Sequence, residues 1–267
     1  MTMTSFYVEV DRGGQRDKKT EVKVVGLAAS PALLFAMAQQ PQGSFVDELS
    51  EPRYDAEHFY ARIMLHHSRH QQGNFHYHQP KDYKVHRVSI VKQYLWLQHE
   101  TLIFEIHHNL PPLNFHHPPF YIRIDRSADH ADKSRAFDRV ICSPIIPVLP
   151  RAKTLWGLLI TINDDLNTNR FDLVCLAALL HATRRIVPDY TLFGHNCFWH
   201  TSATRQVIQE HILAGQEVVV VEDPRRQWCC FRRHRCLGRH MGIPTDIQIQ
   251  NIHNSYVESL AIEGIQV

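Results

Sequence analysis

The chain has 267 residues, of which 29 are Lys or Arg and 27 are Asp or Glu, giving a formal net charge of +2. This balance argues against a protein that binds polyanions through its bulk charge. Hydrophobic residues make up 44% and charged residues 21% of the chain, as is typical of a soluble globular protein long enough to bury a core without disulfide or metal staples.

Residues 1–84 are expected to form an irregular N-terminal region with short helices. Charged and Gln/His-rich segments flank one apolar run there, and helices are predicted near residues 32–39 and 56–65. The first residues lack the apolar core of a signal peptide, and the apolar run is too short to span a bilayer. We therefore expect an intracellular protein, cytoplasmic or nuclear, without a membrane partner, whose six cysteines are free thiols or metal ligands rather than disulfides.

Residues 85–220 are predicted to form an α+β core with a small antiparallel β-sheet. Two runs, 101–107 and 120–125, alternate apolar with polar residues and so predict strands with one buried and one wetter face. The proline-rich connection between them favours an antiparallel pair. Further strand-forming stretches, rich in β-branched and aromatic residues, are 86–100, 156–162 and 217–223.

Two helices are predicted to pack on this sheet. Leucines such as Leu173 and Leu180 recur on one face of a helix that Pro188 ends, and a second apolar stripe lies between residues 201 and 213. Residues 221–267 are expected to form a basic C-terminal extension containing Cys and His. Its last residues alternate weakly and are predicted to add an edge strand.

Cys197 is the candidate nucleophile. It follows Asn196, a good N-cap residue, and is therefore expected in the first turn of a helix. Unpaired backbone N–H groups and the positive end of the helix dipole favour the thiolate form of a cysteine in that turn. Catalysis also requires a base, and without one Cys197 is better explained as a small buried side chain.

Several short motifs occur together between about residue 85 and residue 215. A strand contains His-Glu, a second strand ends in Asp-Arg, a leucine-rich helix follows, and Asn-Cys with two aromatic residues opens another helix. The residues concerned are His99-Glu100, Tyr121–Arg126, Tyr190–Leu192 and Asn196–Trp199. This half of the chain resembles a family of uncharacterised fungal proteins, common in mushroom-forming species, for which no activity is established.

More distantly, a strand histidine followed by Asn-Cys at a helix start is similar to the permuted papain-like fold. That fold occurs in lecithin:retinol acyltransferase and in relatives of NlpC-type peptidases. The resemblance implies that His99 is the base and Cys197 the nucleophile of a thiol hydrolase or acyltransferase. Where those acyltransferases have Asn-Cys-Glu-His-Phe, this chain has Asn-Cys-Phe-Trp-His.

The strand register offers a place for a third residue, Asp125. If His107 pairs with Pro119, Asp125 lies opposite Thr101 and near His99. Asp125 could then orient the imidazole, as the logic of a catalytic triad requires. A register shifted by one residue would reverse this arrangement.

The same alternation raises a conflict about the base. By alternation His99 lies on the wetter face of its strand, whereas the helix that carries Cys197 is expected to pack on the face of Leu102. On that face the alternative base is His108, at the far end of the strand. A bulge near Glu100 is the other way to bring His99 round to the helix.

A second candidate site lies in the C-terminal extension. Zinc prefers four soft ligands in a tetrahedron, and the candidate ligands are Cys229, Cys230, His234 and Cys236. The segment 225–239 also interleaves arginines with aromatic residues. Such a segment can bind nucleic acid, act as a nuclear import signal or contact a protein partner.

Three classes of function therefore compete. A thiol hydrolase or acyltransferase predicts an imidazole within hydrogen-bond reach of Cys197. A non-enzymatic binding or scaffold domain on the same fold predicts that Cys197 is buried among apolar side chains with no imidazole near it. A zinc-stabilised binder with a basic tail predicts that the C-terminal cysteines and histidine converge, and zinc is the one cofactor for which the sequence offers ligands.

Overall fold

The chain divides into two units, Met1–Ser44 and Phe45–Val267, and the structure, a computed structural model, describes residues of the second. The described residues are 54–71, 79–93, 99–108, 118–149, 152–160, 170–191, 194–216, 218–222, 243–262 and 264–265. The helix predicted near 32–39, the Arg-rich segment 225–239 and the candidate zinc ligands Cys229, Cys230, His234 and Cys236 lie outside them. Those features therefore stay predictions.

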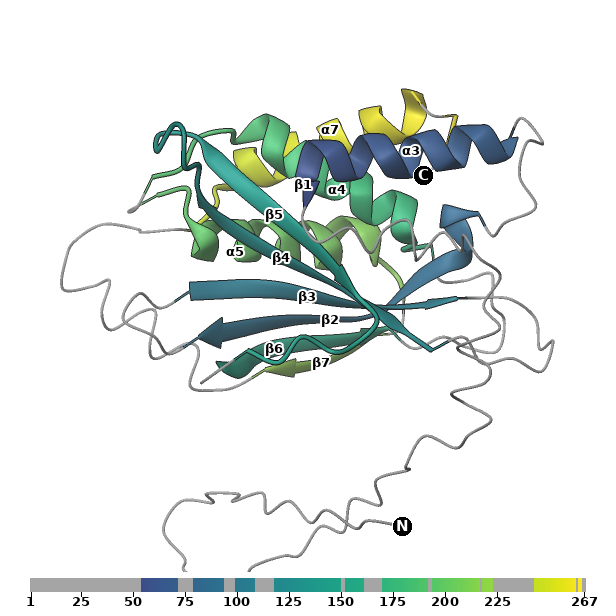
Figure 1. Ribbon diagram of the computed structural model, residues 1–267, viewed down its shortest axis with the longest axis horizontal. Coiled ribbons are helices and arrows are strands. Elements are labelled where there is room, and N and C mark those ends of the chain that lie inside the picture. The colour runs from purple at the N-terminus through teal and green to yellow at the C-terminus, as the bar shows by residue number, and fades with distance from the viewer. Residues whose placement is uncertain are drawn as a thin grey trace, which may run out of the picture. The chain divides into compact units, whose positions relative to one another are not determined.

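The strands of this unit form one antiparallel sheet in the order β1-β5-β4-β3-β2-β6-β7 (Figure 1). Their bounds are β1 Tyr54–Asp55, β2 Tyr83–Gln93, β3 His99–His108, β4 Phe120–Ala128, β5 Ala136–Ser143, β6 Ala152–Ile160 and β7 Val218–Glu222. The sheet and the helices beside it confirm the predicted α+β fold.

The helices gather on one side of the sheet (Figure 1). Their bounds are α3 Ala56–Gln71, α4 Leu173–Ile186, α5 Cys197–Val207 and α7 Asp246–Ile262, with a short 3₁₀ turn, η1, at Pro80–Asp82 and a π-helical turn, η2, at Ile208–Ile212 that continues α5. Because α4 packs against both α3 and α7, it is almost entirely buried, and its polar cap comes from Asp172, which accepts the N–H of Cys175 at 3.0 Å.

The core lies between the helices and one face of the central strands. Leu102, Phe104 and Ile106 of β3 are fully buried, as are Ile122 and Ile124 of β4. This is the period-two alternation that predicted the two strands, and burial of such side chains is the main stabilising contribution to the fold. The opposite face of the same strands carries most of their polar residues.

The C-terminal prediction of an edge strand is wrong, because residues 246–262 form α7. Ile249, Ile252, Tyr256 and Leu260 are buried at helical spacing, whereas Ile247, whose alternation with Ile249 suggested a strand, is exposed. The helix packs on α4, so part of the predicted basic extension contributes to the core.

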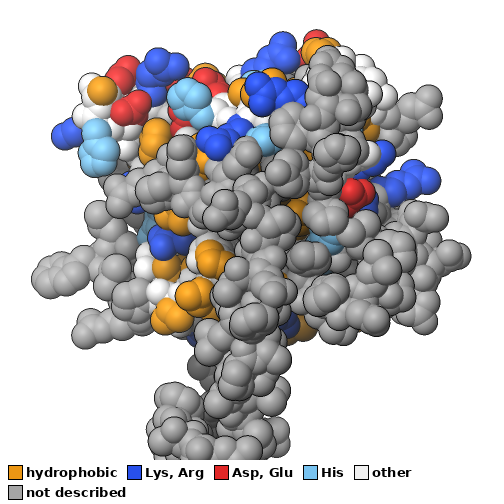
Figure 2. Space-filling model, turned by 45° about the vertical axis from the view of Figure 1, so that its right-hand side comes forward, with side chains coloured by type: hydrophobic (Ala, Val, Ile, Leu, Met, Phe, Trp, Pro, Cys, Tyr) orange, Lys and Arg blue, Asp and Glu red, His pale blue; other side chains and the backbone are white. Residues whose placement is uncertain are grey.

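None of the helices in the described part of the chain is long and apolar enough to cross a membrane. Figure 2 shows basic and acidic side chains interspersed on the described part of one face. That distribution agrees with the nearly equal numbers of the two kinds of charge in the sequence.

Candidate functional site

The carboxylate of Asp125 is held by three neighbours on β3 and β4. Thr101 lies directly opposite Asp125 in the ladder, in the register considered above for a triad, and its hydroxyl donates to Asp125 Oδ1 at 2.6 Å. His99 Nε2 lies 3.4 Å from the same oxygen. Arg123 Nη2 lies 2.7 Å from Oδ2. The side chain of Asp125 is only 8% exposed, so these contacts fix its orientation and its charge.

Cys197 is the first residue of α5, as predicted. Asn196 caps the helix through Oδ1, which accepts the N–H groups of Phe198 at 3.0 Å and Trp199 at 3.2 Å. Two residues before this cap, a Cβ on Gly194 would lie 2.6 Å from Thr191 Oγ1. A larger residue at position 194 would therefore require the Thr191 side chain to move.

His99 joins Asp125 to Cys197. Burial by itself lowers the pKa of His99, but hydrogen bonds with Asp125 and with Cys197 outweigh burial and raise the pKa to about 9. The pKa of Asp125 is lowered: burial raises it, but the hydrogen bonds from His99 and Thr101 and the charge of Arg123 more than offset that effect. The structure thus brings together three residues predicted from the sequence, Cys197, His99 and Asp125.

The interaction between His99 and Cys197 occurs although α5 packs on the face of β3 opposite to the one on which His99 lies. Thr201 of α5 donates to the buried Glu100 at 2.8 Å, so the helix covers the face of Glu100 and Leu102, as expected. The pairing of β2 with β3 is uninterrupted from His99 to Glu105, which excludes a bulge at Glu100 as the explanation. His99 is the first residue of its strand and Cys197 the first of its helix, so the two meet at the ends of both elements.

The alternative histidines lie elsewhere. His108 is at the other end of β3, where its ring centroid is 4.7 Å from that of Tyr83. His195 lies beside Trp199, with ring centroids 5.2 Å apart. His200, one turn after Cys197, is 1% exposed, and burial lowers its pKa to about 4. A neutral His200 packs inside the fold.

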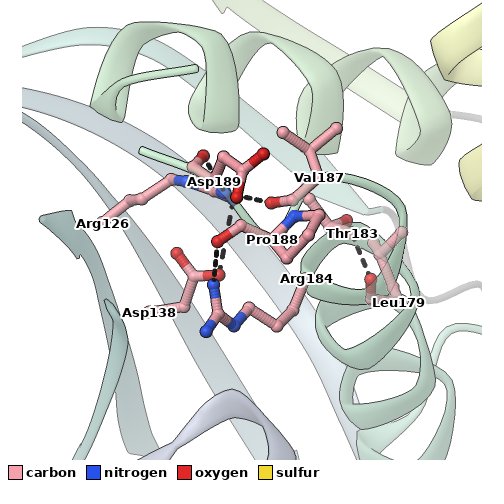
Figure 3. Close-up of polar contacts among 8 residues, drawn as sticks. All are labelled: Arg126, Asp138, Leu179, Thr183, Arg184, Val187, Pro188 and Asp189. Carbon is pink, nitrogen blue, oxygen red and sulfur yellow. Dashed lines mark hydrogen bonds and ion pairs between the residues drawn. The ribbon is translucent and has the colours of Figure 1, made fainter. Parts of the chain in front are cut away.

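A buried ion pair that the sequence did not predict supports the segment before Cys197. Arg126 of β4 and Asp138 of β5 pair across the ladder, with Nη1 3.4 Å from Oδ2 and both side chains at most 1% exposed. Arg126 Nη2 also donates to the carbonyls of Val187 and Asp189 (Figure 3). Its guanidinium lies 5.5 Å from the ring centroid of Trp199. The signal in the sequence was that Arg126, a charged residue, follows Ile122 and Ile124 at the same two-residue spacing and so lies on the buried face of β4.

The other described cysteines differ from Cys197. Cys142 and Cys175 are free thiols, and burial raises the pKa of each to about 12. No histidine affects the pKa of either thiol. Within the described segments, no cluster of three or more His, Cys, Asp or Glu residues could hold a metal ion.

Comparisons of the chain with protein-family models, with curated proteins and with solved structures found no match. The functional argument therefore depends on the geometry of the site.

Proposed function

We propose that this protein is a thiol-dependent hydrolase or acyltransferase in which Cys197 is the nucleophile, His99 the base and Asp125 the residue that orients His99. The observation that carries the proposal is the position of His99. Its Nε2 lies 3.4 Å from the carboxylate of Asp125, and an interaction with Cys197 contributes to its raised pKa. A nucleophile, a base and an orienting acid in this relation are the requirement for thiol catalysis.

The proposed reaction begins when His99 accepts the proton of the Cys197 thiol. Because the pKa of His99 is raised to about 9, the imidazole holds that proton at neutral pH while the sulfur acts as the nucleophile. Because Nε2 faces Asp125, we assign Nδ1 to the sulfur. The thiolate attacks an acyl carbonyl carbon, a C–S bond forms, and the electron pair of the carbonyl moves to its oxygen. The backbone N–H of Cys197 is the donor we assign to that oxyanion.

Collapse of the tetrahedral intermediate completes the first half of the reaction. The electron pair returns from the oxyanion, the bond to the leaving group breaks, and His99 gives its proton to that group. A thioester remains on Cys197. Neutral His99 then takes a proton from water, or from another acceptor hydroxyl or amine, as that molecule attacks the thioester. Collapse of this second intermediate breaks the C–S bond, releases the acylated acceptor and returns the sulfur of Cys197 beside protonated His99. Water as the acceptor makes the protein a hydrolase, and any other acceptor makes it an acyltransferase.

The proposal agrees with the resemblances that the sequence suggests. A strand histidine and an Asn-Cys helix start are the elements expected of a permuted papain-like site, and we propose that arrangement here, together with membership of the fungal family. Cys142, Cys175 and Cys197 are free thiols, which suits a reducing compartment. We therefore place the protein inside the cell, in the cytoplasm or nucleus.

Acylation by p-nitrophenyl acetate tests the proposal. The full chain should release p-nitrophenolate and gain one acetyl group on the tryptic peptide 186–205, which contains Cys197 as its single cysteine. Cys197→Ala and His99→Gln should prevent that acetylation, and Cys142→Ala should not. Equal release by the wild type and Cys197→Ala, or acetylation spread evenly over the cysteines, would refute a nucleophilic Cys197.

A non-enzymatic binding or scaffold domain is the second candidate. The observation in its favour is that Cys197 is only 4% exposed, although a substrate carbonyl must reach its sulfur. This role predicts no acetylation at Cys197 by the ester, while a small alkylating reagent could still reach the thiol.

A further inference from the structure

The start of α7 packs beside the segment that carries Cys197. Thr245 and Gln248 form a capping box there: the N–H of Gln248 donates to Thr245 Oγ1 at 3.2 Å, and the N–H of Thr245 donates to Gln248 Oε1 at 3.0 Å. These reciprocal bonds satisfy backbone donors at the helix start. They also hold the Gln248 side chain in place at the N-terminal end of α7.

Gln248 extends from this capping box to the nucleophile segment, His195–Trp199. Its Oε1 also accepts the indole N–H of Trp199 at 3.3 Å, and its Nε2 lies 3.2 Å from His195 Nε2. One glutamine of α7 therefore contacts residues on both sides of Cys197.

Hydrogen-bond chemistry fixes the protonation state of His195 in this contact. An indole N–H and a backbone N–H can only donate, so the atom of Gln248 that they share is the amide oxygen. The amide NH₂ then faces His195 and must donate to it, which requires that Nε2 of His195 carry no proton. The contact exists with a neutral imidazole whose proton is on Nδ1, and an imidazolium would set two donors against each other.

We propose that Gln248 is a positioning residue for Cys197: it holds the nucleophile segment on α7 while His195 is neutral and releases it when His195 is protonated. The inference rests on the proposed function, because the position of the sulfur matters for catalysis if the sulfur reacts. It adds regulation by pH from a residue distant in sequence from Cys197, His99 and Asp125.

The groups around His195 favour its neutral form. Burial lowers the pKa of His195, the Arg126 guanidinium from β4 lowers it further, and Asp189, from the segment after α4, opposes them without reversing the shift. The neighbours from α5 and α7, Trp199 and Gln248, carry no charge. Since the folded-state pKa lies below 6.5, the contact is complete above pH 6.5 and is lost as the pH falls through the folded-state pKa.

Gln248→Glu separates positioning from a purely structural role. A carboxylate can still accept from Trp199 and Thr245, so the capping box and α7 are retained. It cannot donate to neutral His195, but it pairs with protonated His195. The matched control is Gln250→Glu, because Gln250 is an exposed residue of the same helix whose side chain donates to Asn254.

The measurement is the rate of p-nitrophenyl acetate acylation of Cys197 across pH in the full chain. The wild-type rate should fall as His195 is protonated. Gln248→Glu should be slower than the wild type by roughly tenfold at about pH 8, the scale of one hydrogen bond, and should recover relative to the wild type as the pH falls. Gln250→Glu should follow the wild-type profile. A Gln248→Glu profile that parallels the wild type at every pH would overturn the inference.

NMR distinguishes failure of this inference from failure of the proposed function. The amide resonances of His195, Cys197 and Trp199 should shift together with the protonation of His195 in the wild type, and Gln248→Glu should raise the His195 pKa. If Cys197 is not acylated but these resonances behave as stated, the proposed function fails and the pH-dependent contact stands. If the three amides do not respond to His195, the positioning inference fails whatever the activity.

Discussion

Thr101 donates a 2.6 Å hydrogen bond to the oxygen of Asp125 that also lies 3.4 Å from His99 Nε2. Thr101 and Asp125 are directly opposite in the β3–β4 ladder, so strand pairing sets the position of the carboxylate. Strand pairing therefore places the carboxylate of Asp125 beside His99, where we propose that it orients the imidazole.

The first prediction concerns the charge of this pair. Asp125→Asn should lower the pKa of His99 from about 9 by roughly one to two units, because an amide replaces the neighbouring negative charge. NMR titration of the His99 ring, identified by its loss in His99→Gln, measures the shift. An unchanged His99 pKa would show that Asp125 does not stabilise the imidazolium.

The same pKa predicts how stability depends on pH. A folded-state pKa raised from 6.5 to about 9 means that the contribution of His99 is complete below pH 6.5 and is lost as the pH rises through about 9. The unfolding free energy of the wild type should therefore fall relative to that of His99→Gln over this range. Urea unfolding at several pH values measures it, and a constant difference between the two proteins would contradict the assignment.

Removing the base should slow the chemistry. His99→Gln should reduce acylation of Cys197 by about 10²- to 10⁴-fold, the usual contribution of a general base. His107→Gln is the matched control, since His107 lies on the same strand and pairs with Glu105 at 2.8 Å. Comparable losses in both variants would mean that the effect comes from the strand and not from the imidazole of His99.

The cap before the nucleophile should matter for stability and for rate. Asn196→Ala should cost about 1 kcal/mol of unfolding free energy and should also slow acylation, because the first turn of α5 loses the acceptor for two N–H groups. Asp172→Ala removes the cap of α4 and serves as the control. It should lower stability without a specific effect on the acylation rate, and equal rate losses in the two variants would argue against a special role for Asn196.

Arg126 should be required for folding more than for chemistry. Arg126→Met leaves the buried Asp138 without its partner and should cost about 3–5 kcal/mol. Adding Asp138→Leu should restore part of the loss, because the uncompensated charge is then gone. Denaturant unfolding measures both, and a double variant less stable than Arg126→Met would show that the carboxylate of Asp138 stabilises the fold without Arg126.

The sequence was most informative where local rules determine the structure. Alternation predicted β3 and β4 as strands, the register considered for them is the one found, and the Asn196 cap placed Cys197 in a first turn. Strand β5 was not predicted, because its inward face includes Asp138 and its outward face includes Phe137 and Ile141. Neither face is therefore clearly apolar in the sequence.

The contact of His99 with Cys197 could not be derived in the same way. Parity describes the two faces of a strand, but His99 is a strand's first residue and Cys197 a helix's first residue. Their meeting depends on how α5 lies over the end of the sheet, where Arg126 donates to the carbonyls of Val187 and Asp189 and lies beside Trp199 of α5. Gln248 was missed for a related reason. It lies in α7, and the alternation of Ile247 and Ile249 had predicted a strand there instead of a helix.

Alkylation by iodoacetamide at neutral pH is the most direct test of the central claim that His99 and Cys197 form a working pair. Trypsin separates the described cysteines into the peptides 186–205 with Cys197, 140–151 with Cys142 and 171–184 with Cys175, so each rate can be followed by mass spectrometry. We predict that Cys197 reacts much faster than Cys142 and Cys175, and that His99→Gln removes the difference. Labelling of Cys197 no faster than that of Cys142 and Cys175, which are also buried, or unaffected by His99→Gln, would contradict the claim.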